Sequence, residues 1–425
     1  MIPSFAWVYF ALSLLGLAMA TTAVLPIYRP ATLAMGNFFV GWLSRELASQ
    51  QILLQAIVSA FFLAHGVFDY WPGKVAVAIT LSCWVTLSYA IVQAIRTRNV
   101  LDLALQETLG QDFLQKIPAL WQTQRRGYLQ WLRVFRVFPI RRRDVEKVSG
   151  IVYRKVGDKS LKLDVYHSVE QQGPGQSDGE KKRPTIIYIH GGGWVIGNRG
   201  QQGLPTLNHL AANGWICFTI NYRLSPRATF PDHIIDVKHA IAWVKEHGHE
   251  FGADTDFITL VGGSAGGHLA ALAALSPNDP NFQPGFEDVD TTVQGCVPLY
   301  GIFDLQDSED NWPHRGLKTL MAKQVIKKTI AEAQEIYEQG SPISRITKDA
   351  PPFFLLHGDQ DTLVPIKESR RFVEAFKEGA EASIVLGELP GGQHAFEVFP
   401  SIRTAYAVEA IEEFCAAIYG RHLGR

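Results

Sequence analysis

The sequence predicts an α/β fold, a mostly parallel, doubly wound sheet preceded by an N-terminal helical transmembrane region. Three long uncharged stretches lie within residues 1–95, whereas from residue 149 onward short β-branched runs alternate with segments of helical spacing. Hydrophobic residues make up 47% of the 425 residues and charged residues only 19%, below the roughly 25% typical of soluble domains. This composition excludes a disordered chain and a small disulfide scaffold.

The charges divide the chain into three parts. Residues 1–95 carry three basic and two acidic side chains, residues 96–143 carry ten and three, and the rest carry 27 and 36. The net charge of −1 gives no reason to expect a nucleic-acid partner. We expect a transmembrane region of about three helices over residues 1–95, a basic juxtamembrane collar or cap over 96–148, and an α/β domain over 149–425 with a helical insertion at about 303–350.

Three stretches are candidates for membrane spans: Ile2–Tyr28, Leu47–Phe68 and Val75–Ile95. About 20 apolar residues cross a bilayer core as a helix. The second stretch is interrupted by glutamines and a histidine, and a re-entrant segment there would leave two spans. The first could instead be a cleaved signal peptide, although no basic residue precedes its apolar core.

Basic residues near the span ends predict the orientation. Arg29 and Arg45 lie in the first connection and the basic collar follows the third stretch, whereas the second connection holds only Lys74. Lys and Arg concentrate on the cytoplasmic side. We therefore expect an integral protein of the inner or plasma membrane, with its N-terminus outside and its α/β domain in the cytoplasm.

The collar has an amphipathic pattern over residues 128–138, where YLQWLRVFRVF is followed by three arginines. A basic helix with aromatic anchors can lie in the lipid interface. It can equally pack on the α/β domain as part of a cap, and the sequence leaves both interpretations open.

The α/β domain is predicted strand by strand. Apolar and polar residues alternate in two segments that are predicted to form a hairpin, Ile151–Val156 and Leu161–Tyr166. The later predicted strands are short apolar runs: Thr185–Ile189, Trp215–Ile220, Phe257–Val261, Val293–Leu299, Phe353–Leu356 and Ala382–Leu386. Helical spacing covers Asp232–His247, Ala265–Leu275, 316–340 and Ile402–Tyr419. A polar Gly/Ser loop occupies 171–183. In such sheets, sites form beyond the carboxyl ends of the strands.

The first motif at a strand end is G-x-S-x-G, at residues 262–266 between a predicted strand and a helix. In that context it predicts a sharp turn that holds a serine hydroxyl out of the sheet. Ser264 is therefore the candidate nucleophile.

The second motif is His-Gly-Gly-Gly-Trp at residues 190–194, after another strand. Glycines leave backbone N–H groups free to face a pocket, so Gly192 and Gly193, with the N–H of Ala265, are candidates for an oxyanion hole. A dinucleotide-binding loop, with Arg223 meeting a 2′-phosphate, is a competing interpretation, but the glycine spacing does not match it.

The third motif joins two late segments, HGDQDTLVP at 357–365 and GGQHAF at 391–396. A serine nucleophile needs a base, and the base needs an acid to orient it. We take His394 as the base and Asp361 as the acid, and Asp359 is the competing acid.

These motifs, together with Asn-Tyr-Arg-Leu-Ser-Pro at 221–226, resemble those of HGGG-type esterases and lipases of the α/β-hydrolase fold. That group includes the hormone-sensitive-lipase-like enzymes and related carboxylesterases, and the layout is most similar to membrane-anchored actinobacterial-type lipases and esterases. The resemblance runs from about residue 151 to the C-terminus. It implies that Ser264, His394 and Asp361 form a catalytic triad and that the glycines form the oxyanion hole. One position departs from the hormone-sensitive-lipase-like pattern, because Gly263 stands where many members carry an acidic residue.

We therefore expect a serine carboxylester hydrolase that forms an acyl-enzyme on a lipophilic ester. An amide or formamide hydrolase, an acyltransferase or a non-catalytic membrane scaffold are the alternatives. We expect no cofactor and no metal: there is no HExxH motif or P-loop, the acidic and histidine run at 246–250 ends a helix, and the four cysteines are scattered. The expected partners are a small-molecule or lipid ester and membrane lipid; the oligomeric state is left open.

Overall fold

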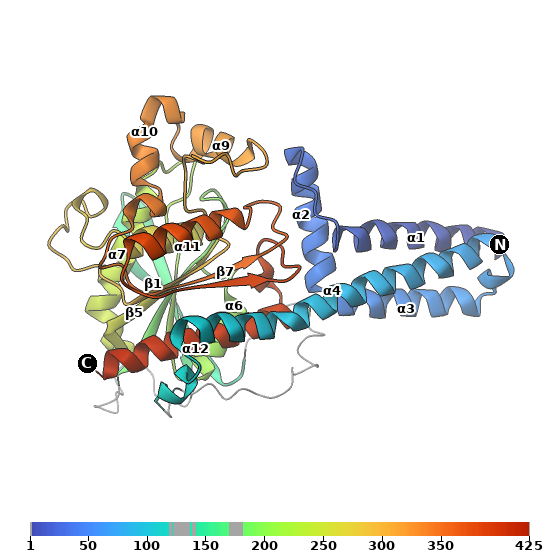
Figure 1. The fold of residues 1–425 in the computed structure, drawn as a ribbon, viewed down its shortest axis with the longest axis horizontal. Helices are drawn as coiled ribbons and strands as arrows, with labels where there is room; N and C mark the ends of the chain where they lie inside the picture. Colours follow the sequence, from blue (N-terminus) through green and yellow to red (C-terminus); the bar gives the residue numbers. More distant parts are fainter. Residues whose placement is uncertain (1, 119–120, 122–136, 138–141, 170–181, 425) are drawn as a thin grey trace.

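The computed structural model describes residues 2–118, 121, 137, 142–169 and 182–424. The chain forms a body built around a sheet, with a helical bundle projecting from one side of it (Figure 1). The N-terminus lies at the far end of the bundle, and the C-terminus lies on the body (Figure 1). The amphipathic pattern at 128–138 and the polar loop at 171–183 fall almost entirely outside the described residues.

An eight-stranded sheet forms the centre of the body, in the order β1-β2-β4-β3-β5-β6-β7-β8. β1 and β2 form an antiparallel hairpin, β2 pairs antiparallel with β4, and all further pairings are parallel. The strands are β1 (Val145–Val156), β2 (Lys159–Ser168), β3 (Arg183–Ile189), β4 (Ile216–Ile220), β5 (Ala253–Gly263), β6 (Gly295–Leu299), β7 (Phe353–Gly358) and β8 (Ile384–Leu389). Each overlaps a predicted strand, so the mostly parallel α/β fold is confirmed.

Helices cover both faces of the sheet, and each face has its own apolar core. One core joins the sheet to α7 (Asp232–His247), α8 (Ala265–Ala274) and α11 (Lys367–Gly379). The other joins it to α6 (Leu204–Ala212), α12 (Ile402–Leu423) and the second half of α4 (Trp71–Leu109). The sheet is thus buried on both sides, as its continuous β-branched strands require.

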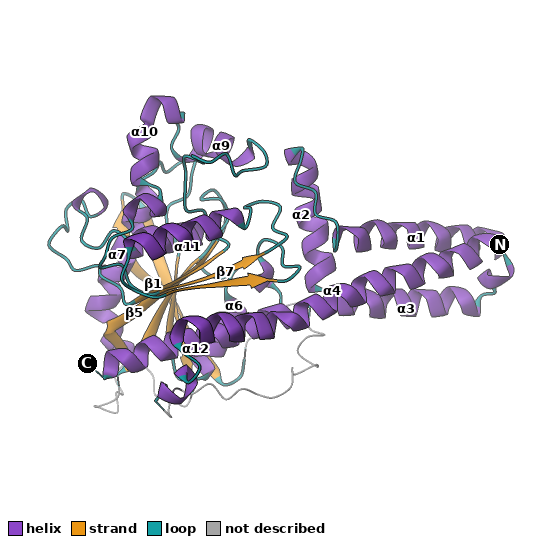
Figure 2. Cartoon of the chain, viewed as in Figure 1, coloured by secondary structure: helices purple, strands orange, loops and turns teal. Residues whose placement is uncertain are grey.

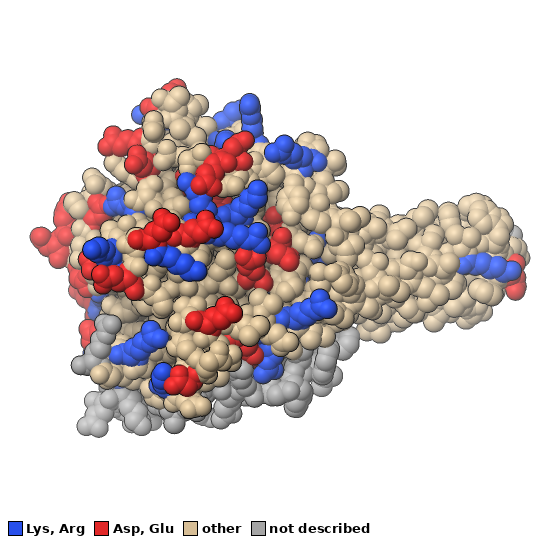
Figure 3. Space-filling model, viewed as in Figure 1, with Lys and Arg blue, Asp and Glu red and all other residues tan. Residues whose placement is uncertain are grey.

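The bundle consists of α1 (Ile2–Thr22), α3 (Ala48–Ala64) and the first half of α4, which run side by side (Figure 1). α1 and α4 are each long and apolar enough to cross a membrane, and α3 adds a third span only if it is counted together with α2 (Ala31–Glu46). α2 is bent away from α3 by 81°. The visible face of the bundle is almost free of charge except at its tip, whereas charges cover the body (Figure 3).

α4 ties the bundle to the body. It continues for 39 residues without a break, so the boundary that we expected at residue 95 falls inside a helix. Beyond that point, the buried Leu101, Leu105 and Leu109 join the core around α12. The beginning of the expected collar is therefore part of the body.

Residues 300–352 separate β6 from β7, in the region where we predict a helical insertion at about 303–350. Its helices are α9 (Gly316–Leu320), a π-helical turn η6 (Met321–Val325) and α10 (Ile330–Gln339), which lie on the same side of the body as the tip of α2 (Figure 1). Short 3-10 turns complete the described chain: η1 (Val67–Asp69), η2 (Phe113–Lys116), η4 (Gly248–Phe251), η5 (Pro280–Phe282), η7 (Pro342–Arg345) and η8 (Phe396–Val398).

Candidate active site

Ser264 sits on the turn between β5 and α8, where the sequence motif places it. Its backbone has φ +55° and ψ −120°, a strained conformation for a residue with a side chain. The turn is closed by close backbone contact, because a Cβ at Gly266 would collide with the carbonyl oxygens of Ile189 and His190. This geometry is that of a nucleophile elbow, in which the serine side chain is held away from the sheet.

The structure brings Ser264, His394 and Asp361 together. His394 Nε2 lies 2.8 Å from Ser264 Oγ, and His394 Nδ1 lies 2.7 Å from Asp361 Oδ2. With the proton on Nδ1, the imidazole donates to the carboxylate and accepts from the serine hydroxyl. The three side chains therefore form a continuous chain that can remove a proton from Ser264.

Asp361 is completely buried, and four groups hold it. Its Oδ1 accepts hydrogen bonds from the backbone N–H groups of Leu363 (2.8 Å) and Val364 (2.9 Å), and His357 Nε2 lies 3.2 Å from Oδ2. Burial alone would raise the pKa of Asp361, but the charge and hydrogen bonds of His394, aided by His357, outweigh burial and hold that pKa well below its usual range. Asp361 therefore stays ionised, as a carboxylate that orients an imidazole must.

Asp359, the competing acid, faces elsewhere. Its Oδ1 accepts a hydrogen bond of 2.7 Å from the backbone N–H of Gly391, and burial raises its pKa. It helps to fix the turn before His394 and has no hydrogen bond to the imidazole among the described residues.

The glycine loop after β3 lies against the serine turn. A Cβ at Gly191 would lie 3.1 Å from the Cβ of Ser264. Gly192 and Gly193 adopt φ +111° and +60°, and a side chain at Gly192 would collide with the carbonyl of Ile196. Within the described part of the chain, their N–H groups donate to no protein acceptor. Free N–H groups beside a serine hydroxyl can bind an oxyanion.

The insertion and a buried carboxylate complete the surroundings of the serine. The side chain of Leu320 in α9 would lie 3.3 Å from a Cβ at Gly193, so the insertion forms part of the wall. The Tyr300 ring packs 4.5 Å from the His394 ring. A Cβ at Gly263 would lie 2.5 Å from Tyr300 Oη and 3.2 Å from Glu397 Oε1. Tyrosine and glutamate thus fill the space beside the position that is acidic in many similar enzymes.

Sequence reasoning missed the part that α2 plays in this site. The Phe38 ring meets the His394 ring edge-on with centroids 5.9 Å apart, and the Trp42 indole N–H donates to the carbonyl of Ala395 at 2.9 Å. The buried Arg45 guanidinium donates to the carbonyls of Gln360 and Gly391 and so holds both triad loops. We considered residues 29–46 only as a connection between spans, and only the isolated charge pair at 45–46 signalled anything more.

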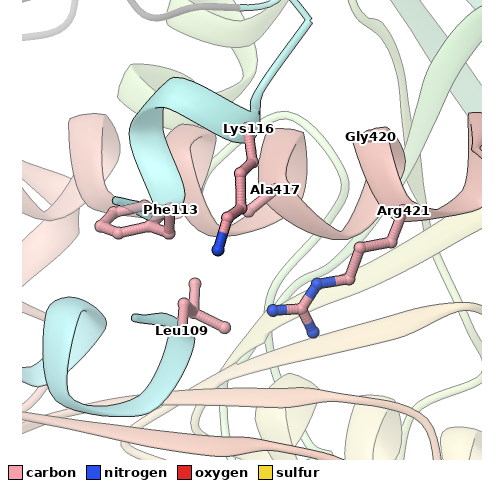
Figure 4. A pocket seen from close by; sticks show the side chains of 6 residues that line it. All are labelled: Leu109, Phe113, Lys116, Ala417, Gly420 and Arg421. Carbon is pink, nitrogen blue, oxygen red and sulfur yellow. The ribbon is translucent and has the colours of Figure 1, made fainter. Parts of the chain in front are cut away.

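The competing sites do not assemble. Arg223 is bound to Asp232 and Asp236 of α7, at 2.8 Å each, rather than held free for a phosphate. In the part of the chain that the structure describes, no group of three His, Cys, Asp or Glu side chains is arranged to hold a metal. A separate pocket of about 310 Å³ lies between η2 and α12, with the Lys116 and Arg421 cations at its edge (Figure 4). Its described lining residues include no serine, threonine, cysteine or histidine.

Several known proteins are similar to this chain. Residues 174–376 match the model of the BD-FAE family. The probable carboxylic ester hydrolase LipM of Mycobacterium tuberculosis is 42% identical over 332 residues, which are 76% of this chain and 74% of LipM. The chain belongs to the BD-FAE family of α/β-hydrolases. Esterase LipQ of the same organism is 38% identical over 77% of this chain and 76% of its own length.

Solved esterase structures are similar to this chain. The butyrate-bound esterase Est2 of Thermogutta terrifontis superposes with a TM-score of 0.52 at 25% identity, and the match covers 64% of this chain and 93% of Est2. The resemblance to esterases in the sequence is thereby confirmed. This BD-FAE member is a carboxylic ester hydrolase that carries an N-terminal helical bundle.

Proposed function

We propose that this BD-FAE esterase is a membrane-embedded serine hydrolase that cleaves lipophilic carboxylic esters through an acyl-enzyme. One observation supports the mechanism above all: the unbroken hydrogen-bond chain from Ser264 Oγ through His394 to Asp361. The proposed roles are nucleophile for Ser264, general base and acid for His394, and orienting carboxylate for Asp361.

Acylation begins when Ser264 Oγ attacks the carbonyl carbon of the ester and its proton passes to His394 Nε2. Negative charge develops on the former carbonyl oxygen. The N–H groups of Gly192, Gly193 and Ala265 are proposed to stabilise it, and the N-terminus of α8 directly after Ser264 adds a favourable dipole. Collapse of this intermediate breaks the bond to the alcohol, which leaves with the proton from His394.

Deacylation repeats the same steps with water as the nucleophile. His394 takes a proton from water, the hydroxide adds to the acyl carbon, and the carboxylic acid leaves as the proton returns to Ser264 Oγ. The ionised Asp361 stabilises the imidazolium in both halves. An amide or formamide hydrolase and an acyltransferase would share the acyl-enzyme, and the esterase relatives favour ester hydrolysis.

The surface of the bundle supports the membrane location. Large apolar side chains project from it, with Val85 72%, Ile57 60% and Leu15 59% exposed. Small residues fill its interior contacts, including Ala20, Ala90 and others of the cluster around Cys83. Exposed apolar side chains outside and small residues inside are typical of helices packed in lipid. We propose that the bundle spans the inner or plasma membrane and that the body lies in the cytoplasm.

The test is the reaction of Ser264 with a fluorophosphonate probe. Full-length protein in detergent should be labelled at Ser264, as located by peptide mass spectrometry, and Ser264→Ala should lose turnover by a factor on the order of 10⁶. Ser344→Ala, in η7, serves as the matched control and should keep wild-type activity. More than about 1% residual activity in Ser264→Ala would contradict the assignment.

A further inference from the structure

α2 lies across the axis of the bundle. α1, α3 and the first half of α4 run along that axis, and α2 departs from α3 by 81° where the bundle meets the body (Figure 1). If the bundle axis crosses the bilayer, as proposed above, a helix at nearly a right angle to it lies close to the membrane plane. Its position at the body end of the bundle then places it at the membrane surface that faces the body.

The outward face of α2 is apolar. Its exposed large side chains are Leu33, Met35, Phe39 and Leu43, of which Leu33 is 55% and Phe39 is 52% exposed. Met35, Phe39 and Leu43 recur every four residues along one side, and Leu33 lies in the first turn of the helix. The helix has no exposed charge, because Arg45 and Glu46 are both buried. A helix that faces water normally has charged or polar residues on its outer side. This face is instead apolar, like the exposed surface of the bundle.

The inward face of the same helix touches the active site. The Thr362 hydroxyl donates to the carbonyl of Ala34 at 3.3 Å, directly after Asp361 in the chain. The contacts of Phe38 and Trp42 with the His394 loop lie on this side as well. The carboxyl ends of the parallel strands, where Ser264 is placed, also face this side, as the arrowhead of β7 shows (Figure 2). A single helix therefore separates the outer apolar face from the triad.

We infer that α2 is an interfacial helix whose outer face is seated in the lipid of the leaflet nearest the body, just below the headgroups. The bilayer is the occupant, because the face is apolar, uncharged and adjoins helices long enough to span. A seated α2 holds the mouth of the active site against the leaflet, so that an ester dissolved in the membrane reaches Ser264 without crossing water. This inference rests on the proposed membrane insertion and esterase function.

The first test measures depth directly and does not require activity. The four native cysteines are buried, so bimane attached to Phe39→Cys reports on α2 in full-length protein reconstituted in phosphatidylcholine vesicles. We expect quenching by a lipid with a spin label near its headgroup and protection from aqueous iodide. Val85→Cys on the bundle should be quenched by deeper labels. Val289→Cys, in the loop before β6 at the amino-terminal ends of the parallel strands, should respond only to iodide. A Phe39→Cys that behaves like Val289→Cys would overturn the proposal.

The second test separates substrate delivery from catalysis. Met35→Glu/Phe39→Glu should lower hydrolysis of a long-chain ester embedded in vesicles by about tenfold or more, while turnover of soluble p-nitrophenyl butyrate stays within about twofold. Val289→Glu is the matched control and should change neither rate. Equal losses on both esters, or no loss on the embedded one, would contradict the proposal. If wild-type protein hydrolysed neither ester, the proposed function would fail instead, and the depth measurement would still decide the position of α2.

Discussion

Glu46, the last residue of α2, accepts a hydrogen bond of 2.6 Å from the hydroxyl of Ser401, which follows His394 by seven residues. The same buried carboxylate is ion-paired with the fully buried Arg403 of α12. Because Arg403 also donates to the carbonyl of Pro390 at 2.9 Å, these contacts bracket the His394 loop from both ends. α2 is thus built into the active site and is more than a tether.

Glu46→Ala should therefore destabilise the protein strongly. Removing one partner of a buried ion pair leaves the other charge buried and uncompensated, which costs about 3–5 kcal/mol. The measurement is the free energy of unfolding by denaturant in detergent micelles. Glu388→Ala, which breaks the exposed pair with Arg370, is the matched control and should cost less than about 1 kcal/mol. Similar losses in the two variants would show that the Glu46 contacts do not support the body.

The second half of α4 provides a further prediction about the domain boundary. Leu105→Ala should cost about 2–5 kcal/mol, because this side chain is fully buried in the core beside α12. Leu103→Ala, two residues earlier and 57% exposed, should have almost no effect on the same unfolding curve. By the same argument, a fragment beginning at residue 144 should be unstable. A well-folded fragment of that length would contradict this account of α4.

The two aspartates after β7 are predicted to differ in catalysis. Asp361→Asn should lower kcat for a soluble ester by a factor on the order of 10⁴, because the amide favours the wrong tautomer of His394. Asp359→Asn, two residues away, keeps an oxygen that can accept from the Gly391 N–H and should lose far less. The opposite ranking would assign the acid role to Asp359.

The sequence was informative where the local pattern of residue types determines the structure. Alternation of apolar and polar residues identified the first two strands, and buried apolar runs identified the other six. The turn chemistry of the glycines located Ser264 and the loop at 190–194. It was uninformative where long-range packing decides. α2 reads as a connection between apolar stretches because its inward contacts, such as Trp42 with Ala395, join positions more than 350 residues apart. The filling of space beside Gly263 by Tyr300 and Glu397 likewise depends on three segments far apart in the chain and cannot be predicted from local pattern.

Buried histidines predict a loss of stability in acid. Burial lowers the pKa values of His190 and His268 from 6.5 to about 4. Between pH 6.5 and 4 the unfolded chain therefore binds protons that the folded chain does not. The free energy of unfolding is highest above this range and falls as the pH falls through it. Each histidine contributes a loss on the order of 3 kcal/mol.

His268→Gln provides the check on this pH dependence. The glutamine amide can still donate to the carbonyl of Gly340, which His268 Nε2 contacts at 2.7 Å, but it cannot take up a proton. The loss of stability between pH 6.5 and 4, measured by denaturant unfolding, should shrink in this variant. His249→Gln, at an exposed position, should leave the pH dependence as it is in the wild type. A wild-type stability that does not change across the window would contradict the prediction.

The arrangement of the bundle makes the membrane topology testable at two points. The N-terminus and η1 lie at the far end of the bundle, and Arg45 is buried against the body at the near end (Figure 1). An inserted bundle therefore separates η1 from the body by the full bilayer, because the 21 residues of α1 extend about 30 Å. From the basic residues near the body, we predict that this side is cytoplasmic. Asp69→Cys in η1 should react with a membrane-impermeant maleimide applied to intact cells, whereas Asp288→Cys on the body should react only after lysis. Labelling of Asp288→Cys in intact cells would place the esterase domain outside, and labelling of both positions only after lysis would show that the bundle does not span the membrane.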